Sequence, residues 1–221
     1  MRRITAYWFD LRTLPGDALL AYRLEGWAGA WKAVASRSLH RLFRNGRLIV
    51  FAHPVDQMVD VAPPAGVRIT QPTGQEWARL ASLVGRRELQ RFLALSARGR
   101  RCLVAWRGDT PVGYAWVAGD LGPDVALSPL PLAFPSSAAY LLNLYVLPSE
   151  RSSGIGSALA SGRLRLAREI GFREGWRMVA STNAPSLRTV QKTAAATRVV
   201  GEIRFVQLLG RTYARFTPSG R

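Results

Sequence analysis

The chain of 221 residues is long for one small domain and short for two large ones, and its 48% hydrophobic content suffices for a buried core. Its single cysteine excludes an internal disulfide and a multi-cysteine metal site, and two histidines are too few for a histidine-based metal centre. The net charge of +17 suits an anionic partner such as nucleic acid, an acidic membrane surface or a phosphate-bearing ligand. However, the arginines are spread along the chain, which favours a generally basic surface and disfavours nucleic acid.

No targeting or membrane-spanning signal is recognisable in the sequence. The N-terminal segment lacks the apolar core of a signal peptide, and no run of about 18 apolar residues occurs. We therefore expect a cytoplasmic protein.

Residues 1–60 are predicted to form a basic helical extension. Apolar residues recur at helical spacing from Asp17 to Arg44, and a short strand is expected at residues 47–52. The basic face of the helix consists of Arg37, Arg41 and Arg44. This face would either lie on a membrane surface or be solvated, and the solvated interpretation is favoured.

Residues 61–221 predict one α/β domain that follows a Pro-rich linker. Its first half is predicted to contain a strand at 67–70, a helix opened by the capping box Thr73–Glu76, a helix at 87–96, and hairpin strands at 102–106 and 112–117. After a Pro-rich loop at 119–137, the second half is predicted to contain strands at 140–147, 176–181, 199–208 and 212–216 and helices at 154–170 and 185–194.

The segment from Tyr140 to Gly156 carries the strongest functional signal. An apolar strand turns at Pro148 into the loop Arg151-Ser152-Ser153-Gly154-Ile155-Gly156, and a helix follows. Helix N-termini present free N–H groups and the positive end of a dipole, and small residues let a phosphate approach them closely. Arg151 would add a charged contact. Taken alone, the loop is equally consistent with a tight strand-to-helix connection.

In its context, the segment resembles the GNAT superfamily of N-acetyltransferases, whose cofactor loop has the form Arg/Gln-x-x-Gly-x-Gly/Ala behind an apolar strand. The resemblance extends from about Val67 to Phe216. It implies a mixed α/β fold with a central, mostly antiparallel sheet of six or seven strands and helices on both faces. The sheet would splay between residues 140–147 and 176–181. A Rossmann-type site would need a third spaced glycine and a later acidic residue that the sequence lacks in that form.

The same resemblance implies the binding site and makes residues 61–221 an acyltransferase domain. The main chain of Leu144, Tyr145 and Val146 would hold the pantetheine arm of acetyl-CoA or another acyl-CoA. The Leu144 amide would face the thioester carbonyl, which makes Leu144 and Tyr145 the catalytic candidates. Residues 151–156 would bind the pyrophosphate. Asn183 would contact the pantetheine arm, or it would only cap the next helix.

The catalytic half of the pattern departs from the family. Val190 stands where many members have a tyrosine acid, and Tyr140 stands where a carboxylate base often lies; residues 125–149 contain no Asp or Glu. We therefore expect the amine proton to leave through water, with Tyr140 and Tyr145 as candidate organisers of that water and Tyr213 as a further candidate acid. The tyrosines are equally suited to structural positions.

Other polar candidates have weaker support. Asp120 and Asp124 in the Pro-rich loop would bind a cationic substrate or remain solvated, and the solvated interpretation is favoured. Cys102 is expected to be a small core residue, and His40 and His53 have no predicted role.

Three functional interpretations remain open from the sequence. The first is direct acyl transfer from CoA to a primary amine of a small molecule or protein. The second is transfer to a larger anionic or membrane-linked acceptor, such as an amino sugar of a surface glycan. The third is a non-catalytic module that binds acyl-CoA, nucleic acid or a membrane surface.

Overall fold

The computed structural model describes residues 19, 21–28, 31, 43–120, 132–193, 196–208 and 211–220. The chain divides into two compact units, residues 1–45 with 206–213 and residues 46–205 with 214–221. In the first unit, residues 21–28 are helical, as the sequence predicts. Arg37 and Arg41 of the predicted basic face lie outside the described residues, as does the side chain of Arg44. The predicted helix end at Arg44 is wrong, because Phe43 and Arg44 belong to a strand.

The elements follow the predicted order. The first half of the chain contains β1 (Phe43–Pro54), η1 (Val55–Gln57), β2 (Val67–Thr70), α2 (Glu76–Arg79), α3 (Ala81–Ala97), β3 (Arg101–Arg107) and β4 (Thr110–Ala118). The second half contains β5 (Ala138–Val146), η2 (Pro148–Glu150), α4 (Ile155–Glu169), β6 (Glu174–Ala180), α5 (Ala184–Thr193), β7 (Arg198–Leu208) and β8 (Arg211–Pro218).

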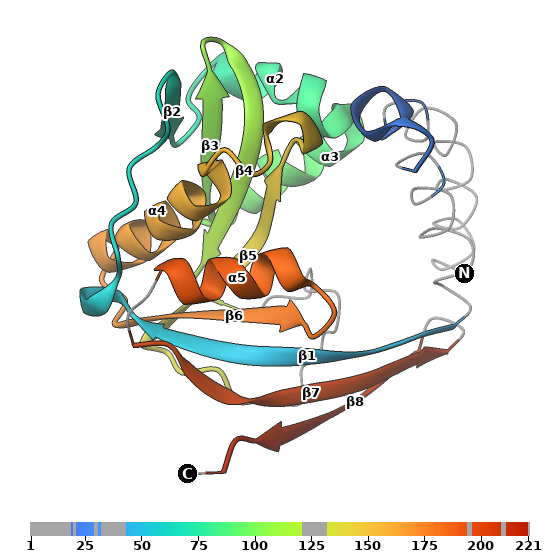
Figure 1. Ribbon diagram of the computed structural model, residues 1–221, viewed down its shortest axis with the longest axis vertical. Helices are drawn as coiled ribbons and strands as arrows, with labels where there is room; N and C mark the ends of the chain where they lie inside the picture. The colour runs from blue at the N-terminus through green and yellow to red at the C-terminus, as the bar shows by residue number, and fades with distance from the viewer. Residues whose placement is uncertain are drawn as a thin grey trace. The chain divides into compact units, whose positions relative to one another are not determined.

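The strands form one sheet in the order β2-β3-β4-β5-β6-β1-β7-β8 (Figure 1). Pairing is antiparallel from β2 to β5 and between β6 and β1, whereas β5 and β6 pair in parallel. The predicted mixed α/β fold with a mostly antiparallel sheet is confirmed.

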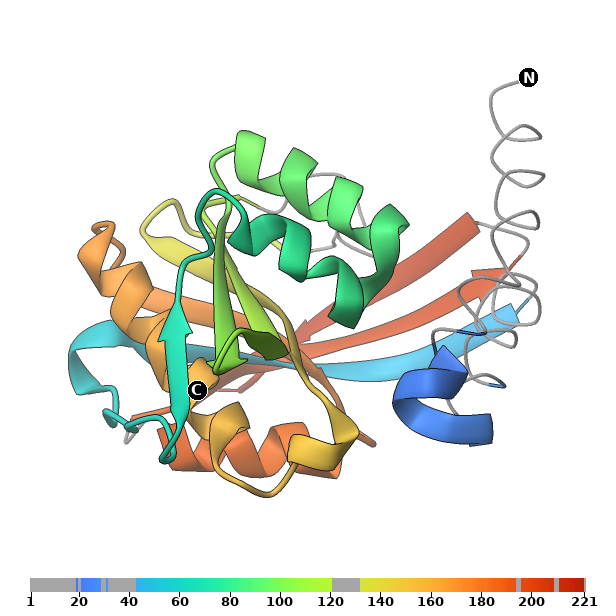
Figure 2. The ribbon, with the colours of Figure 1, turned by 90° about the horizontal axis from the view of Figure 1, so that it is seen from above.

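Helices cover both faces of this sheet (Figure 2). On one face, Phe92 of α3 meets the indole of Trp116 on β4 edge to face at 5.0 Å, and both side chains are fully buried. On the other face, Leu159 of α4 packs in a cluster with Leu141 of β5. Each face thus has its own apolar core, and these two cores fix the positions of β4 and β5.

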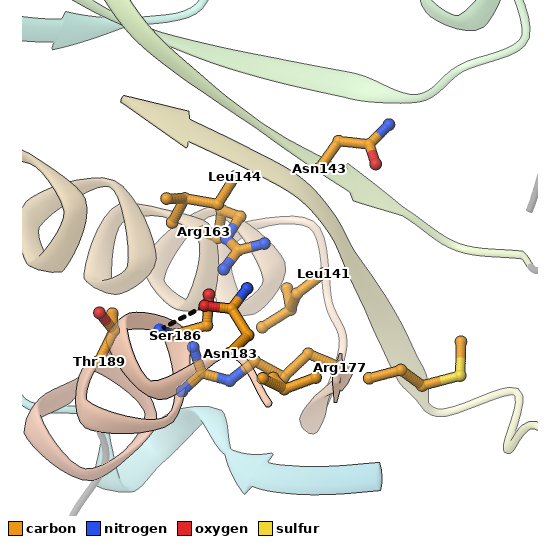
Figure 3. Close-up of a pocket in the computed structure, with 10 residues that line it drawn as sticks. Leu141, Asn143, Leu144, Arg163, Arg177, Asn183, Ser186 and Thr189 are labelled. Atoms are coloured by element: carbon orange, nitrogen blue, oxygen red, sulfur yellow. Dashed lines mark hydrogen bonds between the residues drawn. The ribbon is translucent and has the colours of Figure 1, made fainter. Parts of the chain in front are cut away.

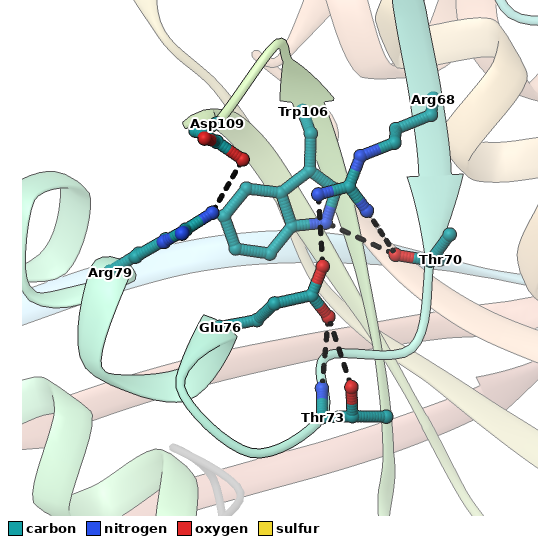
Figure 4. A network of polar contacts seen from close by, with 7 residues as sticks. All are labelled: Arg68, Thr70, Thr73, Glu76, Arg79, Trp106 and Asp109. Carbon is teal, nitrogen blue, oxygen red and sulfur yellow. Dashed lines mark hydrogen bonds and ion pairs between the residues drawn. The ribbon is translucent and has the colours of Figure 1, made fainter.

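Only half of the predicted capping box is present before α2, because Glu76 reaches back to Thr73 but the Thr73 hydroxyl does not cap the helix (Figure 4). The Glu76 carboxylate accepts hydrogen bonds from the Thr73 N–H at 3.0 Å and the Thr73 hydroxyl at 3.4 Å. It also pairs with Arg68 at 2.9 Å. The Thr73 N–H bond is the main cause that lowers the pKa of Glu76, and Arg68 adds to it. This network fixes the chain between β2 and α2.

The sheet has eight strands where six or seven were predicted, because β1 is an interior strand. It pairs with β6 from Leu48↔Ala180 to Pro54↔Glu174. Alternate β1 residues are buried on opposite faces: Val50 packs with Ile203, and Phe51 packs with Val179. A strand buried on both faces reads as a continuous apolar run rather than an alternating one. Residues 46–54 therefore lie in the same compact unit as the predicted acyltransferase domain, before the predicted boundary at residue 60.

Across the described stretches of the chain, no helix combines the length and apolar character needed to cross a membrane.

Candidate functional site

The site begins where strands β5 and β6 separate. They pair only at Ala138↔Glu174, Ala139↔Gly175 and Tyr140↔Trp176, although both strands continue for several residues. Beyond this short paired segment the strands diverge, so a cleft opens between them. The predicted splay of these two strands is confirmed.

A β-bulge interrupts β5 beside this cleft. Tyr114 of β4 pairs with Tyr145, and Trp116 pairs with Leu142, so β5 contains one residue more than β4 over this step. Asn143 absorbs the extra residue with a φ of 45°, a left-handed conformation that asparagine tolerates better than most residues. In the described register, Asn143 and Leu144 have no ladder partner on β4 or β6. The regular pairing of β5 is therefore interrupted at these two residues, beside the cleft.

The loop after β5 forms an open backbone cradle at the start of α4. Ser152 has a φ of 65° and Gly154, the N-cap of α4, has a φ of 95°. No side chain caps this helix end. Left-handed residues among right-handed ones turn successive N–H groups toward one point, which creates an anion-binding concavity. The N–H groups of the first helical turn add to it because they have no intrahelical partner.

Side chains around the cradle hold it without filling it. Arg151 donates from Nε to the Val146 carbonyl at 3.2 Å, and the Ser153 hydroxyl donates to the Glu150 carbonyl at 2.6 Å. Ile155 is fully buried and anchors the helix start in the core. A Cβ at Gly154 would meet no atom within 4 Å. The predicted loop residues thus lie together, with the side chain of Ile155 turned to the core and the backbone turned outward.

The cleft between the splayed strands is a cavity of about 190 Å³ (Figure 3). It is lined by Leu141, Asn143 and Leu144 of β5, Arg177, Met178 and Val179 of β6, Arg163 of α4, and Asn183, Ser186 and Thr189 at α5. Of the predicted site residues, Leu144 and Asn183 line this cavity. Tyr145 instead stacks on Tyr114 at 5.6 Å between ring centroids, and Val146 is part of the core.

Asn183 caps α5. Its Oδ1 accepts a hydrogen bond from the Ser186 N–H at 3.2 Å, which satisfies a free donor at the helix start (Figure 3). The Asn183 side chain therefore caps this helix, and its contact with the pantetheine arm stays a prediction. Because a capping side chain uses only its oxygen, the amide NH₂ group is left to donate to a ligand in the cleft.

Two buried arginines of the cleft have no counterpart among the predicted site residues. Arg163 is 3% exposed and Arg177 is 5% exposed. Arg177 donates from Nε to His53 Nε2 at 2.8 Å and from Nη2 to the Thr193 hydroxyl at 3.3 Å. Since His53 Nε2 accepts, Nδ1 carries the ring proton and donates to the Thr197 hydroxyl at 2.8 Å. His53, which had no predicted role, therefore positions Arg177.

The burial of His53 predicts a dependence of stability on pH. Burial, together with the charges of Arg177 and Arg163, lowers the pKa of His53 from 6.5 to about 3. Below pH 6.5 the unfolded chain therefore binds a proton that the folded chain does not bind until about pH 3. We expect the free energy of unfolding to fall with decreasing pH, with a His53 contribution approaching about 1.4 kcal/mol per pH unit.

Urea unfolding between pH 7 and pH 5 checks this expectation, because most carboxylates titrate below that range. His53→Gln should remove the contribution, whereas substitution of the other histidine should leave it. An unchanged pH slope in His53→Gln would contradict the assignment of a neutral, buried His53.

The proton-transfer candidates lie as follows. Val190 is 2% exposed and packs in the core with Phe51, so no acid occupies that position. Tyr140 is buried, and burial raises its pKa to about 12, which excludes it as a base near neutral pH. Tyr213 is 61% exposed on β8.

The other polar candidates among the described residues do not line the cleft. Asp120 pairs with Arg100 at 3.4 Å, and Asp124 lies outside the described residues. Cys102 is a core residue whose thiol pKa is raised by burial.

The splayed parallel strands, the β5 bulge and the backbone cradle before α4 define an acetyltransferase type of fold. The model of the acetyltransferase (GNAT) family matches residues 69–194, which is more than half of the chain, and the chain belongs to this family. No curated protein matches the chain.

Solved structures share the fold at low sequence identity. A Drosophila protein has a TM-score of 0.55 and 14% identity, with 84% of this chain and 68% of that chain covered. A Staphylococcus epidermidis protein of unknown function has a TM-score of 0.51 and 12% identity, with 79% and 65% covered. A fungal glucosamine N-acetyltransferase region in a multi-domain β-N-acetylglucosaminidase has a TM-score of 0.54 and 13% identity, with 79% and 22% covered. The chain thus spans just under two thirds of the Staphylococcus protein and less than a quarter of the fungal one.

Proposed function

We propose that the chain is an acyl-CoA-dependent N-acyltransferase that transfers an acyl group directly from CoA to a primary amine. The observation that carries this proposal is that one strand, β5, lines the cavity with Asn143 and Leu144 and is followed by the backbone cradle at residues 151–156. Phosphates on the cradle would place the rest of the cofactor in the cleft, beside Asn143 and Leu144, where the pairing of β5 with β4 is interrupted.

The residues present fit such a cofactor. The cradle offers several backbone N–H donors at the positive end of a helix of 15 residues, and no side chain competes for them as a cap. The free edge of β5 beside the bulge would bind the amide groups of the pantetheine arm as a neighbouring strand would. Bound acyl-CoA would supply an activated acyl group as a thioester.

Transfer needs little from side chains. The free amine would attack the thioester carbonyl, so that a C–N bond forms and the C–S bond breaks. The amine would lose its proton to water, and CoA would leave as the thiol after its sulfur takes up a proton. The Leu144 amide would donate to the carbonyl oxygen as negative charge develops there. Ser186 and Thr189 line the cleft, but no described carboxylate lines it with them to form a nucleophilic triad. Direct transfer without an acyl-enzyme is therefore favoured.

The test combines binding with turnover. We expect acetyl-CoA at about 100 times its dissociation constant to stabilise the protein by about 2.7 kcal/mol, measured as a shift in melting temperature. A screen of primary amines, including amino sugars and protein N-termini, should then reveal an acceptor by release of free thiol. No shift with millimolar acetyl-CoA on a folded sample would contradict the proposal.

One observation favours a second candidate, a non-catalytic module of the same fold. The family's tyrosine acid is replaced by the buried Val190, and residues 125–149 contain no carboxylate. Such a module would bind acyl-CoA without turnover, or bind a polyanion or membrane through its basic surface. Heparin and anionic vesicles, compared with acetyl-CoA in the same thermal-shift series, distinguish these partners from cofactor binding.

If the chain is catalytic, Tyr145→Phe should lower kcat by less than about tenfold, which corresponds to about 1.4 kcal/mol. The reason is that orientation and the Leu144 amide would carry catalysis, whereas one positioned acid or base contributes about 10²- to 10⁴-fold. Tyr140→Phe should behave in the same way. The measurement is kcat at saturating acetyl-CoA and acceptor. A thousandfold loss with normal cofactor affinity would identify Tyr145 as a dedicated acid or base.

A further inference from the structure

Two arginines, Arg163 and Arg177, line the cleft between β5 and β6 (Figure 3). Arg177 directly follows Trp176, the last β6 residue that pairs with β5. Arg163 reaches the same cavity from α4, seven residues or about 10 Å along the helix from Gly156. Both residues are almost completely buried.

The hydrogen bonds of these guanidinium groups are incomplete and involve only neutral acceptors. Arg163 donates from Nη1 to the Leu142 carbonyl at 3.3 Å, and its buried Nε has no hydrogen-bond partner. Arg177 donates to the neutral ring of His53 and to the Thr193 hydroxyl. No carboxylate in the described part of the chain forms an ion pair with either arginine or contributes to its pKa.

Two like charges in a buried cavity are unfavourable unless an anion joins them. Burial and the charge of Arg177 lower the pKa of Arg163 to about 9, so it is still protonated at neutral pH. Burial lowers the pKa of Arg177 to about 10, so it is also charged. An anion in this cavity would offset both charges and would accept hydrogen bonds from the guanidinium groups that line it.

The position of Arg163 and Arg177 in the cleft indicates which part of a bound cofactor they would face. The cradle at residues 151–156 follows Val146, at the open end of the cleft, whereas Arg177 lies where the cleft closes. A cofactor with its phosphates on the cradle would therefore point its opposite end, the acyl group, toward the arginines. A neutral acetyl group would leave the two charges unpaired.

We propose that Arg163 and Arg177 form a carboxylate-binding subsite, and that the chain uses acyl-CoA thioesters whose acyl group ends in a carboxylate, such as succinyl-CoA. This inference rests on the proposed function. The bonds made and broken would be the same as in the proposed acyl transfer. The amine would gain a succinyl group through a new C–N bond, the C–S bond would break, and CoA would leave as the thiol. The distal carboxylate takes no part in bond making and only fixes the acyl chain.

The test compares succinyl-CoA with acetyl-CoA by calorimetric titration of the full chain. We expect wild type to bind succinyl-CoA at least about tenfold more tightly, because the carboxylate gains charged donors that acetyl lacks. Arg163→Met should reduce this preference to within about threefold, measured as the ratio of the two affinities in the same variant. Arg163→Lys should keep more of the preference than Arg163→Met does, since lysine has the positive charge but lacks the planar guanidinium group that binds a carboxylate through two hydrogen bonds.

Arg165→Met is the matched control, because Arg165 lies on the same helix but is 44% exposed and pairs with Asp60. It should keep the full preference for succinyl-CoA. Equal binding of the two thioesters by folded wild type, or an unchanged preference in Arg163→Met, would overturn the proposal. If Arg163→Met fails to fold, the comparison of succinyl-CoA with acetyl-CoA binding to the wild type still tests the proposal.

Failure of the subsite and failure of the proposed function give different results. If acetyl-CoA and succinyl-CoA both bind equally, the subsite is wrong but the proposed function stands; if neither binds, the proposed function fails. In a second arm, free succinate is added to the protein saturated with CoA. Stabilisation by free succinate equal to that by succinyl-CoA would overturn the assignment to the acyl group and place the carboxylate on the acceptor.

Discussion

Gly156→Asp should weaken acyl-CoA binding by at least about 100-fold, or about 2.7 kcal/mol, and leave the fold intact. Gly156 is the second residue of α4, where the proposed phosphate site lies. A Cβ there meets only the Val146 methyl group at 3.8 Å, which is an ordinary contact. An aspartate is favourable for a helix N-terminus, so stability should be preserved. Its carboxylate would occupy and repel the place of a phosphate.

Gly156→Asn is the matched control, because it has the shape of aspartate without the charge. Calorimetric titration with acetyl-CoA should give an affinity for Gly156→Asn that lies between wild type and Gly156→Asp. Near-normal affinity in Gly156→Asp would show that the phosphates bind elsewhere. Gly154→Asp is a poorer test, since its φ of 95° strains any residue with a side chain.

Asn143→Val should lower kcat/KM by at least about 100-fold. A β-branched residue is strongly disfavoured at the φ of 45° that Asn143 adopts, so the bulge should straighten. Loss of one bulge residue shifts the register of β5 and turns the following residues to the opposite face. The Leu144 amide would then leave the position from which it is proposed to face the thioester.

Asn143→Gly is the control for this prediction, because glycine adopts a positive φ without strain. It should keep kcat/KM within about threefold of wild type, measured with the acceptor found in the thiol-release screen. Equal activity of Asn143→Val and Asn143→Gly would show that the conformation of residue 143 does not matter for transfer.

The loop proposed to bind the cofactor phosphates was predictable from the sequence because it depends on local patterns. The loop at residues 151–156 combines small residues with an apolar strand before it and a helix after it, and each of these has a short-range signal. The capping box at Thr73–Glu76 is local in the same sense, and its contact between Glu76 and the Thr73 N–H is present. The roles of Leu144, Tyr145, Val146 and Asn183 in binding remain predictions.

The place of β1 could not be predicted, because it depends on long-range pairing. Residues 47–52 indicated a strand, but nothing local shows that this strand lies between β6 and β7. The bulge at Asn143 was hidden for the same reason, since it is visible only when β4 and β5 are in register.

The buried arginines were missed for a different reason. Arg163 stands four residues after Leu159 and three before Leu166, on the apolar stripe of α4, and this was a usable signal. It was obscured because the chain has 31 arginines and lysines. The sequence suggests no role for His53, because this residue lies before residue 60 in the predicted extension, although β1 places it beside Arg177.

A crystal structure with bound CoA tests the central claim most directly. We expect the pyrophosphate within hydrogen-bond distance of the backbone N–H groups at residues 152–157, and the pantetheine arm between β5 and β6 beside Leu144. The thiol should point toward the closed end of the cleft, where Arg163 and Arg177 lie. Phosphates bound to surface arginines, with the cleft between β5 and β6 empty of the pantetheine arm, would contradict the proposed function.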